Sequence, residues 1–213
     1  MAGPPYAVKK PAKSILKEEP KPNTYIVADD WIPGEPAVWV LIWGDFLVFG
    51  LFFCIFSYYR AHNFALYSAS QHTMHRGLGF ANTLVLLTSS WFVAQSVRDV
   101  RNGAKARGAR LILGAIFCGL CFCVIKVFDY RASVYAGITL NTNEFYTLYF
   151  MLTGIHLVHV VIGTGVLVYM YALVSQRPVK TKKDIVVLES GGLFWHLIDI
   201  LWVFLFALFY LMV

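Results

Sequence analysis

Charged residues are scarce in this sequence. Only 14% of its 213 residues are Asp, Glu, Lys or Arg, whereas 58% are hydrophobic. A soluble domain typically carries about 25% charged residues, which cover its surface in water. So few charges could not cover the core of a soluble fold of this length. The composition therefore argues against a water-soluble protein and predicts one that is embedded in lipid.

Several common functional patterns are also missing. The polar segments contain no phosphate-binding glycine loop, no Ser–His–Asp arrangement and no paired-carboxylate site, and they are too short for an enzyme domain outside the membrane. The first thirty residues hold no apolar stretch of signal-peptide length, so we expect no cleaved leader. All four cysteines lie inside apolar runs, which argues against an extracellular disulfide framework. We therefore expect no catalytic site in this chain.

What the sequence does contain is five long apolar runs, near residues 37–59, 77–97, 110–130, 145–173 and 192–213. A helix needs about 20 apolar residues to cross the hydrocarbon core of a bilayer, and each run meets that length. The runs lack the polar–apolar alternation of strands in a transmembrane barrel. We therefore predict an all-α, polytopic bundle of five transmembrane helices over 36–213, preceded by a polar tail rich in Pro and Lys over 1–35.

The basic residues are unevenly distributed between the two sides of this bundle. Fourteen of the eighteen fall in the tail and in the loops after the second and fourth runs, which share one side, whereas three fall on the other side. Cytoplasmic segments carry an excess of Lys and Arg, so the N-terminus is predicted in the cytoplasm and the C-terminus outside. The net charge of +6 then fits contact with anionic lipid better than nucleic-acid binding.

Few ionisable residues lie inside the apolar runs, and one group of them falls in the half predicted to face the cytoplasm. This group comprises Asp45, His159, His196 and Asp199. Charge at membrane depth is expensive, so each of them is a candidate functional residue. His196 and Asp199 are three residues apart and therefore share a helix face. Two interpretations stay open: a buried hydrogen bond that specifies helix packing, and a role in binding a lipid headgroup or a proton.

A second group lies towards the outer end of the third run. Lys126 and Asp129 are again three residues apart, and intramembrane charges usually pair. We therefore predict an intramembrane ion pair, with the Lys126 side chain extended towards the outer interface.

Histidines and cysteines in the apolar runs raise the question of a metal or haem. His156 and His159 would need ligand partners on other helices, and no complete ligand set is apparent. No His follows Cys121, so the cysteines do not form a covalent haem-attachment motif. Because Cys118, Cys121 and Cys123 lie on one lipid-embedded helix, they fit small apolar packing residues better than metal ligands. The sequence therefore predicts no metal site.

The fourth run contains TGIHLVHVVIG over residues 153–163, and the fifth contains WHLIDILW over 195–202. Both stretches resemble conserved segments of cytochrome c oxidase subunit III. NTLVLLTS over 82–89 is similar to the family's second conserved segment, and FDY over 128–130, preceded by Lys126, is similar to the end of the third. The four segments follow one another in the family's order on successive runs, and the resemblance extends from about residue 33 to the C-terminus.

This resemblance implies a subunit without haem or copper of its own that binds phospholipid in a bacterial cytoplasmic membrane. It would pack against the large catalytic subunit of a haem–copper oxidase and support proton uptake. Residue by residue, it assigns a lipid or proton-linked region to Asp45, His159, His196 and Asp199. Separately, we expect helix packing or polar contacts from Asn82, His156, Trp195 and Trp202.

Some features depart from the family pattern and keep alternatives open. Asp45 and Asp129 stand where the family usually has glutamate, and the two further N-terminal helices of longer members are absent. The stretch PGEP over 33–36, Asp45 and the short length are similar to the variety that accompanies bacterial nitric oxide reductases. Outside the family, the alternatives are a free-standing transporter or proton channel, whose polar residues would line a pathway, and a haem-binding cytochrome.

Overall fold

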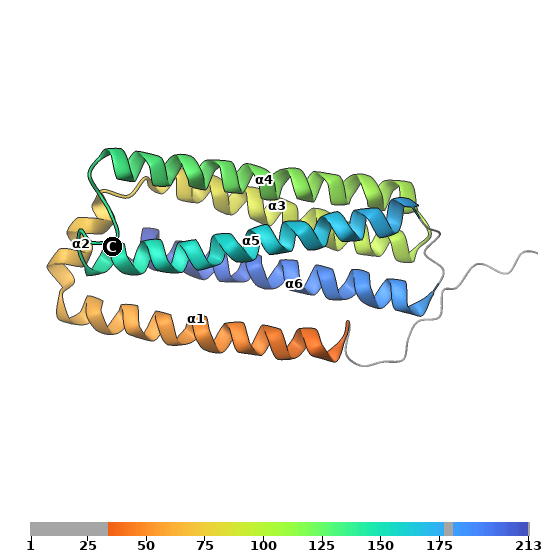
Figure 1. Ribbon diagram of the computed structural model, residues 1–213, viewed down its shortest axis with the longest axis horizontal. Coiled ribbons are helices and arrows are strands. Elements are labelled where there is room, and N and C mark those ends of the chain that lie inside the picture. The colour runs from red at the N-terminus through yellow and green to blue at the C-terminus, as the bar shows by residue number, and fades with distance from the viewer. Residues whose placement is uncertain (1–33, 177–180, 213) are drawn as a thin grey trace, which may run out of the picture.

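The computed structural model describes residues 34–176 and 181–212, and within these ranges every regular element is helical. The helices are α1 (Pro36–His62), α2 (Phe64–His72), α3 (Arg76–Arg101), α4 (Lys105–Tyr135), α5 (Glu144–Gln176) and α6 (Lys182–Phe206), and a π-helical turn, η1 (Ala207–Leu211), continues α6. Five of them are long and apolar enough to cross a membrane. The predicted fold class, a polytopic membrane bundle of five long helices, is confirmed (Figure 1).

The bundle is built around α6. This helix packs against α3, α5 and α1, whereas α4 fills the space between α3 and α5. In the most apolar stretch of α6, 61% of the residues are buried, against 11% in α1. Accordingly, α1 lies along the edge of the bundle, where its main contacts are with α6, α5 and α2 (Figure 1). Most of its side chains are left for lipid or for another protein.

The helix ends follow local sequence signals. Pro36 occupies the first turn of α1, where its missing N–H costs nothing. Gly103 (φ +85°) and Gly137 (φ +76°) adopt the left-handed conformation just after α3 and α4, and glycine enters that region without steric penalty. Thr181 and Asp184 form a reciprocal capping box at the start of α6.

The predicted start of the last helix is wrong by ten residues, and the capping box explains the difference. The apolar run begins near 192, but α6 begins at Lys182, because the capping box satisfies the backbone groups of a first turn at that point. The other long helices also extend a few residues past their apolar runs. Of the predicted tail over 1–35, only Gly34 and Glu35 belong to the described residues, and the Glu35 N–H donates to the Ser190 hydroxyl, 2.9 Å away.

Apolar periodicity did not predict the short helix α2, which covers one end of the bundle. The Gln71 amide donates to the carbonyl of Leu208 at 3.0 Å, and the Asn143 amide donates to the Ser70 hydroxyl at 3.1 Å. Tyr67 packs edge-to-face against Phe56. Burial, followed by the nearby Glu144 carboxylate, raises the pKa of Tyr67 to about 12, so this phenol stays neutral.

Glycine determines how closely α5 approaches α6. A Cβ atom at Gly163 would lie 2.5 Å from Ile198 Cδ1 and 2.9 Å from the Trp195 ring, whereas one at Gly165 would meet nothing within 4 Å. We expect Gly163→Ala to lower the free energy of unfolding by about 1–3 kcal/mol through overpacking. Gly165→Ala is the matched control and should be neutral or slightly stabilising, because alanine favours helix. Unfolding in detergent micelles measures both, and equal effects would contradict this account of the interface.

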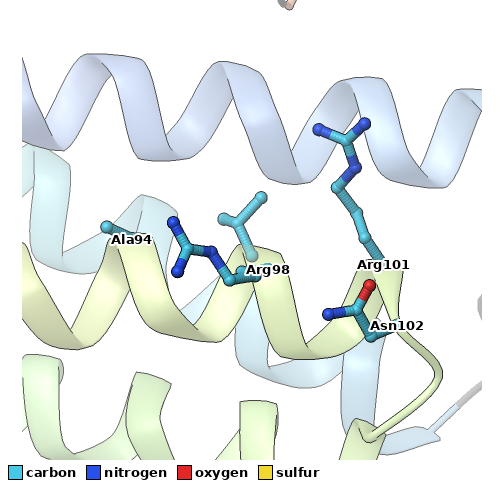
Figure 2. A pocket seen from close by; sticks show the side chains of 5 residues that line it. Ala94, Arg98, Arg101 and Asn102 are labelled. Atoms are coloured by element: carbon cyan, nitrogen blue, oxygen red, sulfur yellow. The ribbon is translucent and has the colours of Figure 1, made fainter. Parts of the chain in front are cut away.

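The α3–α6 contact also involves a glycine and ends beside a small hollow. Gly192 of α6 lies against Val93 and Val97, and a Cβ atom added to it would be 3.6 Å from each of these side chains. Towards the C-terminal end of α3, a surface hollow of about 380 Å³ is lined by Ala94, Val97, Arg98, Arg101 and Asn102 (Figure 2). Basic and apolar side chains thus meet at one end of the bundle.

Candidate functional site: polar pairs within the bundle

Asp45 of α1 and His159 of α5 form a polar pair between two helices. The His159 Nε2 atom lies 3.5 Å from Asp45 Oδ1, and both side chains are 20% exposed. His159 Nδ1 lies 2.9 Å from the carbonyl oxygen of Ile155. A carbonyl only accepts, so Nδ1 carries a hydrogen. Nε2 is then the ring nitrogen that faces Asp45, so the contact brings together an imidazole and a carboxyl group from two different helices.

His196 and Asp199 form a second pair on α6. Asp199 Oδ2 is 3.8 Å from His196 Nδ1, and that nitrogen lies 2.7 Å from the hydroxyl of Ser90 on α3. The Asp199 side chain is 4% exposed, and its two oxygens have no hydrogen-bond partner within the described ranges. The His196 side chain, at 35% exposure, reaches the bundle surface. A buried carboxyl group is thereby connected to the surface through one imidazole.

The four residues that the sequence grouped together therefore occupy two places. One pair lies between α1 and α5, and the other lies between α6 and α3. Within residues 34–176 and 181–212, no ion pair or hydrogen bond joins one pair to the other. Each is consequently a separate place where a polar ligand or a proton could be held.

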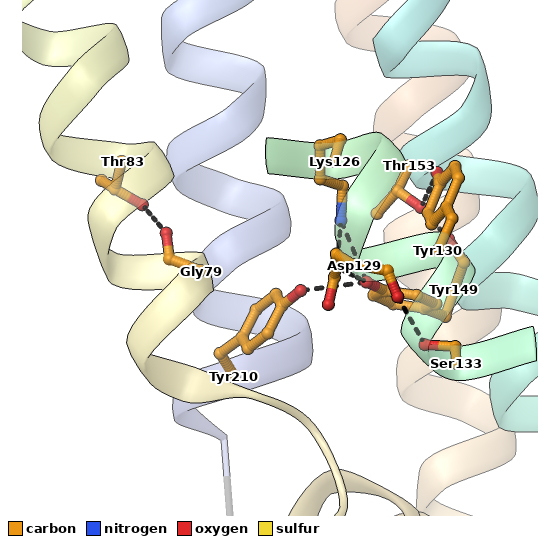
Figure 3. A network of polar contacts seen from close by, with 9 residues as sticks. All are labelled: Gly79, Thr83, Lys126, Asp129, Tyr130, Ser133, Tyr149, Thr153 and Tyr210. Atoms are coloured by element: carbon orange, nitrogen blue, oxygen red, sulfur yellow. Dashed lines mark hydrogen bonds and ion pairs between the residues drawn. The ribbon is translucent and has the colours of Figure 1, made fainter. Parts of the chain in front are cut away.

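Lys126 and Asp129 of α4 belong to a third cluster, which is fully enclosed by the bundle (Figure 3). Lys126 Nζ lies 3.0 Å from Asp129 Oδ2 and donates to the Tyr149 hydroxyl at 2.9 Å. Tyr149 in turn donates to Asp129 Oδ2 at 2.8 Å, and its hydroxyl is 3.0 Å from that of Tyr210. The Nζ atom also lies 5.0–5.3 Å from the ring centroids of Tyr130, Tyr149 and Trp202, within cation–π range.

The expected outward extension of the Lys126 side chain is wrong. Its side chain is 1% exposed, because two hydrogen bonds and three aromatic rings inside the bundle replace the water that it would otherwise seek. Tyr149 and Tyr210, which complete the cluster, were not among the predicted site residues. The sequence did offer one signal for Tyr149, which is a phenol at membrane depth one helical turn before Thr153. That signal could not show which helix Tyr149 would contact.

The remaining predicted residues lie in the core. The Trp202 indole donates to the Thr83 hydroxyl at 3.0 Å and packs edge-to-face on Phe122. His156 is 0% exposed, lies against the Trp202 ring, and has no hydrogen-bond partner at either ring nitrogen among the residues described. Trp195 fills the gap left by Gly119 and Gly163. Asn82 is 1% exposed.

Histidine, cysteine and carboxylate side chains do not converge into groups of three or more anywhere in the part of the chain that the structure describes. Polar side chains are instead arranged as pairs and one cluster. Such an arrangement can hold protons or polar headgroups and can specify helix packing.

The family model for cytochrome c oxidase subunit III matches residues 38–213. The heme-copper oxidase subunit I+III of Aeropyrum pernix is 22% identical over 180 residues, which cover 82% of this chain and 22% of that protein. Cytochrome c oxidase subunit 3 of Schizophyllum commune is 30% identical over 129 residues, or 61% of this chain and 47% of that protein. Cytochrome bo(3) ubiquinol oxidase subunit 3 of Buchnera aphidicola is 25% identical over 176 residues, which cover 82% of this chain and 91% of that protein.

The chain thus spans less than half the length of the first two relatives, but most of the third. The matched region contains all five long helices, both polar pairs and the enclosed cluster of Lys126 and Asp129. The chain is a multi-pass membrane protein and belongs to the cytochrome c oxidase subunit III family.

Proposed function

We propose that this protein is a non-catalytic, accessory subunit of a haem–copper oxidase in a bacterial cytoplasmic membrane, where it packs against the large catalytic subunit. The observation that carries the proposal is the family match over 38–213, which includes every long helix. One relative supports the proposed partner, because its name joins subunit I with subunit III. Haem and copper would then belong to the partner, and phospholipid would be the ligand of this chain.

The exposed surface of the bundle supports assembly with a partner. Large apolar side chains along α1 are exposed, including Val40, Trp43, Leu47 and Leu51 at 58–74%. In a membrane, lipid tails or another helix can cover such a face, and α1 contributes little to the packing of its own bundle. The catalytic subunit and its lipids are the proposed neighbours of this surface.

The Asp45–His159 pair supports a role in proton uptake. Asp45 is nine residues into α1, which at about 1.5 Å per residue places it roughly 14 Å from the helix start. The distribution of basic residues puts that start on the cytoplasmic side. At this depth an imidazole and a carboxyl group from two helices face each other, and side chains of these two types form proton relays in membrane proteins.

Co-purification tests the proposed partner directly. The full chain is extracted from its native membrane in mild detergent and isolated through an affinity tag, and the co-purifying chains are identified by mass spectrometry. We expect a large haem–copper subunit, and its type distinguishes an oxygen-reducing complex from a nitric oxide reductase. Isolation without any such subunit, together with solute or proton flux by the isolated chain in liposomes, would favour the transporter and contradict the proposal.

A substitution at Asp45 tests the proton-linked role. In the intact complex, Asp45→Asn should slow proton uptake while leaving subunit assembly intact, because the amide preserves the side-chain shape and removes the titratable group. Asp45→Glu keeps the carboxyl group and is the matched control that should retain uptake. Two results together would count against the proton-linked and lipid-binding roles of this region. They are a wild-type rate of proton uptake in Asp45→Asn or Asp45→Ala, and a purified complex without bound phospholipid.

A further inference from the structure

The hollow at the C-terminal end of α3 combines two arginines with an amide. Arg101 Nη1 lies 3.0 Å from Glu189 Oε1 of α6, and the Arg101 side chain is 48% exposed. Arg98 is exposed and forms no ion pair with the residues that the structure describes. Figure 2 shows Arg98 and Arg101 extending from one side of α3, with Asn102 beside Arg101 and Ala94 one turn before Arg98.

The charges around this hollow do not cancel. Glu189 neutralises one arginine, which leaves one positive charge on Arg98. A phosphodiester carries one negative charge, and guanidinium groups bind phosphate oxygens through charge-assisted hydrogen bonds. The Asn102 amide adds a further donor at the rim. The hollow is therefore complementary in charge to a single phosphodiester group.

An apolar stripe on α3 leads away from the hollow along the same helix face. Its members are Leu84 (49% exposed), Leu87 (48%), Trp91 (61%) and Ala94, spaced three or four residues apart, and Arg98 continues the series. Arg98 follows Leu87 by eleven positions, which rise roughly 16 Å at about 1.5 Å per residue. This matches about half of the hydrocarbon core, which is the depth of one leaflet.

We propose that this surface of α3 and α6 binds an anionic phospholipid, with its phosphodiester at Arg98, Arg101 and Asn102 and an acyl chain along Leu84, Leu87, Trp91 and Ala94. The surface involves neither polar pair, so the proposal goes beyond the role suggested for Asp45 and His159. A lipid fits better than a free anion because the basic hollow and the apolar stripe are continuous. The end of the bundle that carries the hollow is the one predicted to face the cytoplasm, where anionic lipids attract basic residues.

Binding of defined lipids to the purified full chain tests this proposal. Native mass spectrometry of delipidated protein in mild detergent resolves single binding events, with dioleoylphosphatidylglycerol and dioleoylphosphatidylcholine as the probes. We expect the wild-type chain to prefer phosphatidylglycerol and Arg98→Gln to reduce that preference about fivefold, as one arginine near a lipid surface would. Since Arg98 has no ion-pair partner among the described residues, this substitution should not disturb folding.

Arg110→Gln is the matched control. Arg110 is exposed, donates from Nε to the carbonyl of Ala106 on its own helix, and lies outside the hollow. Arg110→Gln changes the net charge by the same amount as Arg98→Gln and should leave the lipid preference unchanged. Trp91→Ala should weaken the binding of both lipids alike.

Three results would overturn the proposal. The first is an equal effect of Arg98→Gln and Arg110→Gln on the lipid preference. The second is equally tight binding of inorganic phosphate, which would indicate a site for free anions. The third is an Arg98→Gln variant that binds lipid as the wild type does but no longer co-purifies with the large subunit. That result would indicate that the hollow binds a carboxylate of the large subunit. None of these results would affect the family-based role, because co-purification of the wild-type chain tests it separately.

Discussion

Replacing Lys126 with methionine is expected to lower the free energy of unfolding by about 3 kcal/mol, because the substitution leaves an unpaired carboxylate inside the bundle. Asp129 has a side-chain exposure of 7% and takes its charge compensation from Lys126, 3.0 Å away. After the substitution the Tyr149 hydroxyl would still donate to its Oδ2 atom, but no cation among the described residues would compensate its charge. Methionine fills a similar volume, so the loss would report the missing charge rather than a cavity.

The double variant Lys126→Met/Asp129→Asn separates charge from packing. Its asparagine can still accept from Tyr149 but carries no charge, so we expect it to recover most of the lost stability. Denaturant unfolding of the purified chain in micelles, followed by circular dichroism, measures both variants. If the double variant were as unstable as Lys126→Met, the cluster would be held by the lysine's aromatic contacts rather than by the ion pair.

Trp202→Ala should cost about 4 kcal/mol, the scale of removing a large aromatic side chain from a packed core. Trp202 is 0% exposed and packs on Phe122 and His156. Its indole also donates to the Thr83 hydroxyl, so the substitution would remove a bond between α6 and α3. Because α6 is the central helix of the bundle, the cavity would weaken several interfaces at once.

Two further variants test this assignment by the same unfolding measurement. Trp202→Phe keeps most of the buried ring and loses the indole N–H, so we expect a loss of about 1 kcal/mol. Trp91→Ala removes an indole from α3 that is 61% exposed, and it should change stability by less than about 0.5 kcal/mol. A small effect of Trp202→Ala, comparable to that of Trp91→Ala, would contradict the central place of Trp202 in the packing.

The sequence predicted most accurately those features that depend on a single helix. The number of long helices and the fold class followed from apolar runs of membrane length. Residues three apart, such as Lys126 with Asp129, had to share a face because helix geometry alone places them. The start of α6 was missed because a capping box, and not apolarity, determines it. The helix α2 was missed because nine residues are too few for a clear apolar period.

The amino-acid sequence by itself thus determined that this chain has five helices long and apolar enough to cross a membrane, and its motifs determined the family resemblance, because length, apolarity and residue order are local properties. Only the tertiary structure decided that Asp45 meets His159, that Tyr149 and Tyr210 enclose the Lys126–Asp129 pair, and that Arg98 borders a hollow beside α6. These contacts depend on which helices are neighbours and how they are rotated. Close approach at glycines such as Gly119 and Gly163 sets that geometry, and it acts between residues far apart in the chain.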